Sequence, residues 1–234
     1  MGRSRRRSLL VPLLALTAAS CDEAPAFVET TALDATMRVW SYEDGSGAMS
    51  LRVATLDGTP TRLENTDEVN VAVAGWSIDV ARPSDGPDPV YSAALPEAPP
   101  DDAINVAVLR LETESAPFNG AVFPAAFGEL TLPDSWSRSA DQLEVTWTEA
   151  GDADPITLRI DGSCIDPYEV EVDSQAAAFT VPPGAIASPS GVPNSGCPVT
   201  LQLTRARPGE PDPAWNSGQI EALTRAERLL TVHP

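Results

Sequence analysis

Strict alternation of apolar and polar residues recurs along this chain and constrains its fold more than any other feature. Residues 49–53, 69–73, 104–108, 143–147 and 156–160 place apolar side chains at every second position. Alternate side chains of a β-strand point to opposite faces, so a period of two predicts strands with one buried face. The 23 prolines and 15 glycines interrupt longer elements. The sequence therefore predicts many short strands and an all-β fold.

A weak internal repeat divides the chain. Residues 67–73 parallel residues 141–147, and residues 104–110 parallel residues 199–205 in the same order. Each sheet must cover its apolar face with a second layer, so strands that recur in one order predict two copies of one layered unit. We therefore expect two tandem β-sandwiches.

The expected domain boundaries follow from this repeat. The first β-sandwich domain should span residues 34–113 and the second should span residues 118–234. Residues 112–120 do not alternate and are the expected junction. The proline-rich residues 83–102 are the expected loop across the first domain.

Residues 143–160 carry a resemblance to known modules. Trp147 ends one alternating strand, and another alternating strand follows a short loop. This order resembles the second and third strands of fibronectin type III and immunoglobulin-like modules, in which a buried tryptophan ends a strand. The resemblance implies two tandem immunoglobulin-like β-sandwiches with Trp147 in a core. Residues 197–199 depart from it, because such modules often carry a tyrosine there, and this leaves the strand topology open.

The C-terminal segment fits neither period cleanly. Residues 220–230 consist of good helix formers, so strand and helix both remain open there. We expect residues 228–233 to form the closing strand of the second sandwich.

Residues 1–20 have the organisation of a secretory signal. Residues 3–7 are rich in arginine, residues 9–16 form an apolar run, and small residues occupy positions 18–20. The apolar run is shorter than the roughly 20 residues that span a bilayer. We predict that residues 1–20 are a cleaved signal peptide, exported by either the general secretory or the twin-arginine route.

Cys21 directly follows this signal. The order of small, small and cysteine after an apolar run resembles the lipobox of bacterial lipoproteins, with Ala18 where that family most often has leucine. The resemblance implies that Cys21 is acylated and that residues 21–33 are a lipidated tether, since two or three acyl chains hold a protein firmly. It places the chain in the bacterial cell envelope, and we favour the outer membrane over the inner membrane. An ordinary secretory signal is the alternative.

The charge of the chain limits its partners. The full chain has a formal charge of −19, and removal of residues 1–20 leaves −23. Such a charge repels nucleic acid and anionic headgroups. The expected partners are the membrane through the lipid anchor and an envelope protein or glycan, and not nucleic acid.

Residue usage also argues against an enzyme. The sequence contains no lysine, and its one histidine, His233, is the penultimate residue. Nucleophilic triads and most zinc sites need a positioned imidazole. We expect no catalysis and no cofactor.

Two further cysteines remain, Cys164 and Cys197. An even pair in an exported domain predicts a disulfide.

Two acidic residues and two tryptophans are weaker candidates for binding sites. Asp152 and Asp154 resemble the Asp-x-Asp pair of calcium-binding cadherin-like domains, although chance acidic turns are common in a chain with 34 acidic residues. Trp136 and Trp215 lie in loops rich in proline, serine and aspartate, where they could form a stacking surface for sugars or a lid over a sandwich end.

The sequence therefore predicts a lipid-anchored, non-catalytic binding or structural module with an unknown ligand. A carbohydrate-binding module on Trp136 and Trp215 is the first alternative. A calcium-dependent adhesion module on Asp152 and Asp154 is the second.

Overall fold

The computed structural model describes residues 28–83, 86–148, 153–190 and 196–234. A short 3-10 turn, η1 (Thr30–Ala32), precedes a chain of strands, which confirms the all-β prediction. The strands are β1 (Leu33–Tyr42), β2 (Gly47–Thr55), β3 (Pro60–Thr61), β4 (Glu68–Val73), β5 (Trp76–Asp79), β6 (Tyr91–Leu95), β7 (Ala103–Leu109), β8 (Ala116–Val122), β9 (Leu130–Thr131), β10 (Ser135–Ser137), β11 (Leu143–Trp147), β12 (Ile156–Gly162), β13 (Tyr168–Val172), β14 (Ala178–Val181), β15 (Cys197–Pro208) and β16 (Ser217–His233). Within these described ranges, no helix has the length and apolar character needed to cross a membrane.

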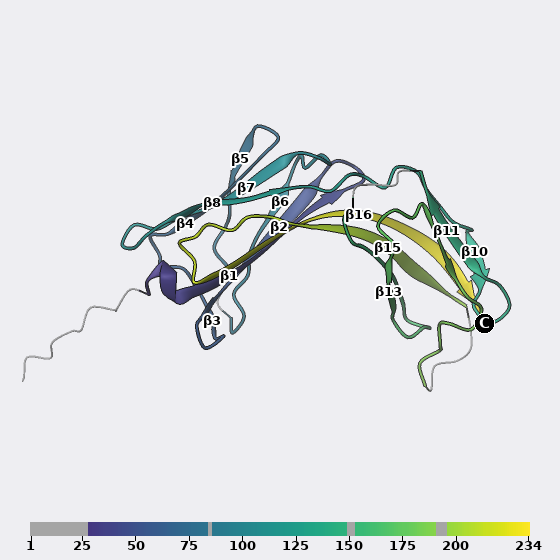
Figure 1. Cartoon of the computed structure of the whole chain (residues 1–234). Coiled ribbons are helices and arrows are strands. Elements are labelled where there is room, and N and C mark those ends of the chain that lie inside the picture. Colours follow the sequence, from purple (N-terminus) through teal and green to yellow (C-terminus); the bar gives the residue numbers. More distant parts are fainter. Residues whose placement is uncertain (1–27, 84–85, 149–152, 191–195) are drawn as a thin grey trace, which may run out of the picture.

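One nine-stranded sheet runs through both halves of the molecule (Figure 1). Its strand order is β13-β12-β15-β16-β1-β2-β3, and β10 and β6 pair with β16 and β2 at its margins. β1 runs parallel to β16, whereas β15 and β16 form a long antiparallel hairpin. Two smaller sheets, β5-β4-β7-β8 and β14-β11-β9, supply the second layers.

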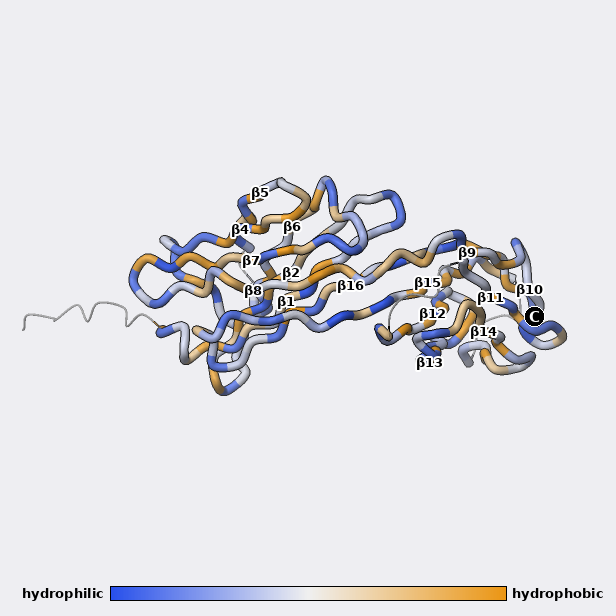
Figure 2. The backbone as a smooth tube through the Cα atoms, turned by 45° about the horizontal axis from the view of Figure 1, so that its top comes forward, coloured by the Kyte–Doolittle hydropathy of each residue, from blue (hydrophilic) through white to orange (hydrophobic). Residues whose placement is uncertain are grey.

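The molecule has two hydrophobic cores, one in each half. The first contains buried residues of β1, β2, β4 and β7, and the second contains buried residues of β9, β11, β12, β14 and β15. Apolar residues accordingly recur along the strands of both halves (Figure 2). Trp147 is 3% exposed and lies in the second core, as its phase in the alternating strand predicts.

β16 contributes to both cores. Ile220 and Ala222 belong to the first core, and Ala226, Leu230 and Val232 belong to the second. All five occupy even positions, so a single face of the strand carries both cores. A strand of 17 residues extends about 56 Å at about 3.3 Å per residue. The two sandwiches therefore share one continuous sheet.

The C-terminal segment is thus a strand along its whole length. Residues 220–230 lie inside β16, and the closing strand expected over residues 228–233 begins earlier, at Ser217. Pairing with β1 on one side and β15 on the other outweighs the weak helix preference of these residues.

Two segments differ from their expected structures. The predicted junction at residues 112–120 overlaps β8, which pairs with β7, so residues 116–122 belong to the first half. The predicted loop at residues 83–102 contains β6, which pairs with β2. Neither strand alternates cleanly in sequence, because Pro117 and Gly120 interrupt β8 and small residues fill β6. The domain boundaries at residues 34–113 and 118–234 stay a prediction.

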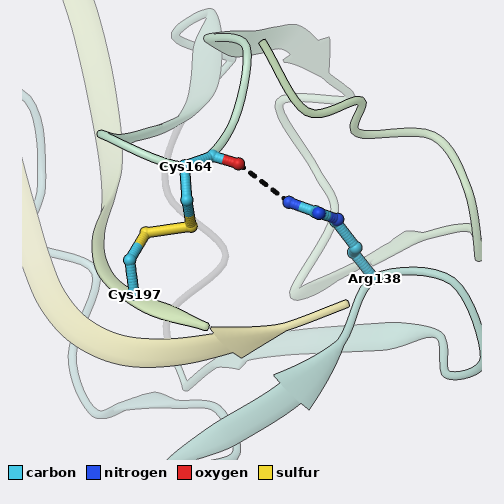
Figure 3. The surroundings of a disulfide bond; sticks show 3 residues. All are labelled: Arg138, Cys164 and Cys197. Atoms are coloured by element: carbon cyan, nitrogen blue, oxygen red, sulfur yellow. Dashed lines mark hydrogen bonds between the residues drawn. A yellow bond between two sulfur atoms is a disulfide. The ribbon is translucent and has the colours of Figure 1, made fainter. Parts of the chain in front are cut away.

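A disulfide joins Cys164 and Cys197, which confirms the predicted pair. Their Cα atoms lie 6.1 Å apart, and the two residues are separated by 33 positions in the sequence. Beside the disulfide, Arg138 Nη1 donates a hydrogen bond of 2.8 Å to the carbonyl oxygen of Cys164 (Figure 3). Closing a loop of this length stabilises a fold by about 3 to 4 kcal/mol in the chain-entropy account.

Candidate functional site

The site is built at the waist, which we define as residues 203–207 of β15 and 222–226 of β16. Here the two cores adjoin along the shared hairpin. Side chains of odd-numbered positions in β15 and even-numbered positions in β16 face the cores. The remaining side chains of the waist lie on the opposite, open face of the sheet.

On the core face, the waist holds the linker, residues 123–128, which connects β8 to β9. Arg205 is fully buried and donates from Nη1 to the carbonyl oxygens of Ala125 and Ala126, at 3.0 and 2.6 Å. Its guanidinium carbon lies 4.5 Å from the centre of the Phe127 ring, in cation–π geometry. Thr224 Oγ1 donates to the carbonyl oxygen of Pro124 at 2.6 Å. These contacts fix the linker against both halves.

Arg207 extends this arrangement to the start of β12. Its Nε and Nη2 donate to the two carboxylate oxygens of Asp154, at 3.0 and 2.7 Å. Its Nη1 also donates to the carbonyl oxygen of Phe123 at 3.4 Å. A bidentate pair between guanidinium and carboxylate fixes geometry as well as charge. The core-face arginines of the waist are therefore structural.

On the open face, strand register brings side chains from distant parts of the chain into two rows. Trp40 pairs with Leu223, and Leu223 pairs with Ala206, which makes an apolar row. The adjacent polar row comprises four side chains: Tyr42, Arg225, Thr204 and Thr157. These two rows are two residues apart along the same strands, so they lie side by side on one face.

A groove of about 480 Å³ crosses the open face at these rows. Trp40 and Leu223 line it on the apolar side, and Arg225, Thr204 and Thr157 line it on the polar side. Leu223 is 8% exposed, and the others are half-buried. This volume falls within the range of small-ligand sites, which is roughly 300 to 1,000 Å³.

Ion pairs close both ends of the groove. Arg38 Nε lies 3.4 Å from Glu221 at one end. At the other end, Arg159 binds Asp161 and also lies 3.3 Å from Glu169. The hydrogen bond and charge of Asp161, helped by Glu169, raise the pKa of Arg159. These exposed pairs contribute little to stability, but they occupy the carboxylates that flank the groove.

Arg225 differs from these arginines because it has no polar partner. Its Nε is buried, and the side chain makes no hydrogen bond or ion pair with any residue that the structure describes. The hydroxyl groups of Thr157, Thr204 and Tyr42 likewise make no hydrogen bond within the described ranges. A buried donor without an acceptor costs about 1 to 3 kcal/mol. The polar row therefore holds donors and acceptors that no described residue satisfies.

The two tryptophans predicted as a sugar-stacking surface lie inside the protein. Trp136 is 2% exposed, and its Nε1 donates to the carbonyl oxygen of Asp141 at 2.9 Å. Trp215 is 5% exposed, and its Nε1 donates to Asn119 Oδ1 at 2.9 Å. They belong to different cores, so neither offers an exposed ring face for stacking. This corrects the hypothesis of a sugar-stacking surface on these two residues; the other interpretation, a lid over a sandwich end, stays a prediction.

The predicted calcium pair is only partly described. Asp152 lies outside the described residues, as does Cys21. Asp154 is 8% exposed and engaged with Arg207. Within the described ranges, no group of three or more His, Cys, Asp or Glu side chains is placed to hold a metal ion. The calcium hypothesis stays a prediction.

Sequence reasoning missed the groove, although part of it was visible. Arg38, Trp40 and Tyr42 occupy alternate positions of β1, opposite the buried Met37 and Val39. An aromatic pair on the polar face of an alternating strand is a signal for a surface site. The positions of Arg225 and Thr204 beside them depend on register between distant strands, which the sequence does not specify.

Comparisons with known proteins give only distant structural likenesses. No model of a known protein family matches the chain, and no curated protein sequence matches it. Among solved structures, the FN1–FN3 domains of chicken CNTN1 align with a TM-score of 0.28 and 9% identity, covering 83% of this chain and 65% of that chain. A segment of two fibronectin type III domains from chicken tenascin aligns with a TM-score of 0.27 and 12% identity, covering 78% of this chain and 91% of that chain.

A third likeness is to α2-macroglobulin of E. coli in its native conformation. It has a TM-score of 0.28 and 12% identity, and the alignment covers 88% of this chain and 14% of that chain.

Proposed function

We propose that the chain is a lipid-anchored, non-catalytic binding module of the bacterial cell envelope. The observation that carries the proposal is the groove at the waist, built on a sheet that both sandwiches share. The core-face contacts of Arg205, Arg207 and Thr224 hold the linker and fix the two halves around the groove. A binding surface with fixed walls loses less entropy when a ligand binds.

The positions of the two ends of the molecule also support a groove that is held away from the membrane surface. η1 lies at one end of the molecule and the C-terminus lies at the other (Figure 1). Cys21 precedes Val28 by seven positions in the sequence, so an acyl anchor at Cys21 would be within about 25 Å of Val28, next to η1. The groove would then face the envelope space between the anchored end and the free end.

The groove chemistry supports binding rather than catalysis. Asp161, Glu169 and Glu221 are all paired with arginines, so none of them is placed as a free general base. General acid–base catalysis needs a group that can exchange its proton with a bound substrate. Hydroxyl, guanidinium and indole groups are suited to recognition without chemical change.

The anchor is tested by fractionation of cells that express the full chain. Wild type should sediment with the envelope membranes, and its intact mass should include the fatty acids at Cys21. Cys21→Ala should release the chain into the soluble fraction, whereas Ser50→Ala, an exchange on β2, should leave it in the membranes. A Cys21→Ala chain that still sediments with membranes would contradict the anchor.

A further inference from the structure

We propose that the groove at the waist binds one carboxylate group carried on a small apolar body, with Arg225 as its anion partner. This inference rests on the proposed binding function and names the class of ligand. The carboxylate would lie along Arg225, Thr204 and Thr157, the members of the polar row that line the groove. The apolar body would lie against Trp40 and Leu223.

Arg225 is the residue that favours an anionic ligand. In a chain with 15 basic and 34 acidic residues, a guanidinium has many candidate partners, and yet Arg225 has none among the described residues. Arginine presents its donors in a planar fork that matches a carboxylate. Two threonine hydroxyls stand in the same row and can donate to the same oxygens or accept from a neighbouring group.

The surroundings of the groove restrict the ligand to a single negative charge. The groove is lined by three arginines and three carboxylates, and Arg38 and Arg159 are paired with those carboxylates, so Arg225 is the one arginine of the lining that is left for a ligand. The formal charge of −19 on the whole chain opposes the approach of a polyanion. A ligand with one negative charge can pair with Arg225 without displacing the ion pairs of the groove.

The position of the groove favours a small molecule over an extended peptide. Extended peptides commonly bind by adding a strand to an open sheet edge. The groove instead crosses β12, β15, β16 and β1, which are consecutive neighbours in the sheet. Recognition there depends on side chains, and the apolar row of Trp40, Leu223 and Ala206 offers a surface for a flat or compact body.

The test is a titration of the ¹⁵N-labelled full chain in detergent micelles, followed by NMR. The probes are 3-phenylpropionate and its neutral amide, 3-phenylpropionamide, which share one apolar body. We expect the carboxylate to bind about tenfold more tightly than the amide, as a charge-assisted hydrogen bond predicts. Arg225→Gln should remove the preference for the carboxylate over the amide. Trp40→Ala should lower the affinity of the protein for both probes.

Arg52→Gln is the matched control, because Arg52 is an exposed arginine of β2 already paired with Asp88 at 3.1 Å. It should leave both affinities unchanged. Thermal unfolding and an intact disulfide would establish that each variant is folded.

Three results would overturn the inference: no chemical-shift change at about 10 mM carboxylate, equal affinity for acid and amide, or an unchanged preference in Arg225→Gln. A peptide of the form acetyl-Glu-Phe-amide that binds more than tenfold more tightly than 3-phenylpropionate would replace the small ligand with an acidic peptide. The titration does not depend on the anchor, so failure of the membrane fractionation and failure of the groove ligand are separate outcomes.

Discussion

Arg205 and Arg225 lie on neighbouring strands of the waist, on opposite faces of one sheet. Arg205 faces the cores, is fully buried, and meets two linker carbonyls and the Phe127 ring. Arg225 faces the groove and meets no polar partner among the described residues. Two arginine side chains in one stretch of sheet therefore have different environments.

This contrast separates structural arginines from an arginine available to a ligand. A buried guanidinium is tolerated when carbonyls, carboxylates or aromatic faces contact it. Arg207 meets a carboxylate, and Arg205 meets two carbonyls and an aromatic ring, although Arg205 Nε itself makes no hydrogen bond among the described residues. Arg225 keeps its hydrogen-bonding capacity at some cost in stability. Three substitutions test the contrast, and we take them in order of expected effect.

Arg205→Met should cause the largest loss, about 4 kcal/mol of unfolding free energy. Methionine keeps much of the volume, but the carbonyl oxygens of Ala125 and Ala126 lose their donor inside the protein. Urea unfolding followed by tryptophan fluorescence measures the change. A loss below about 1 kcal/mol would show that this side chain does not hold the linker.

Asp154→Asn should cost about 2 kcal/mol, because the amide keeps one acceptor and removes the charge that faces Arg207. The pair is partly exposed, with side-chain exposures of 23% for Arg207 and 10% for Asp154, which keeps the loss below that of Arg205→Met. Calorimetric unfolding measures it. Asp161→Asn, in an exposed pair, is the control and should change stability by less than about 0.5 kcal/mol. Equal losses for the two variants would contradict this assignment.

Arg225→Gln should cause the smallest loss, and stability should stay equal or rise, because no described residue loses a partner and an unpaired buried Nε–H is removed. Urea unfolding under the same conditions as for Arg205→Met gives the direct comparison. A loss as large as that of Arg205→Met would erase the distinction between the two faces.

The all-β architecture could be predicted from the sequence because alternation of side chains reports directly on strand faces. The sharing of one sheet by both halves could not be predicted from the sequence, because it depends on the pairing of β1 with β16, which come from opposite ends of the chain. Residues 220–230 are good helix formers, so their composition did not indicate a strand. They form one because they pair with strands from distant parts of the chain. The disulfide between Cys164 and Cys197 was predictable because the interpretation of Cys21 as an acylation site left these two cysteines as the one pair.

The site was harder to predict than the fold. Trp136 and Trp215 sit in loop-like sequence, yet each buries its ring and satisfies its N–H within the protein. Composition does not reveal such packing. The groove requires Trp40 beside Leu223 and Arg225 beside Thr204, and both pairings depend on exact register. Of the residues in and beside the groove, only Arg38, Trp40 and Tyr42 could be recognised in the sequence, as alternate residues on the polar face of one strand.

The most direct measurement is a ¹H–¹⁵N spectrum of the arginine side chains during addition of 3-phenylpropionate, with signals assigned through the variants. The account predicts that the Nε–H signal of Arg225 shifts with saturation, whereas those of Arg205 and Arg207, which lie on the core face away from the groove, stay in place. A stationary Arg225 signal, or equal shifts of all three, would contradict it.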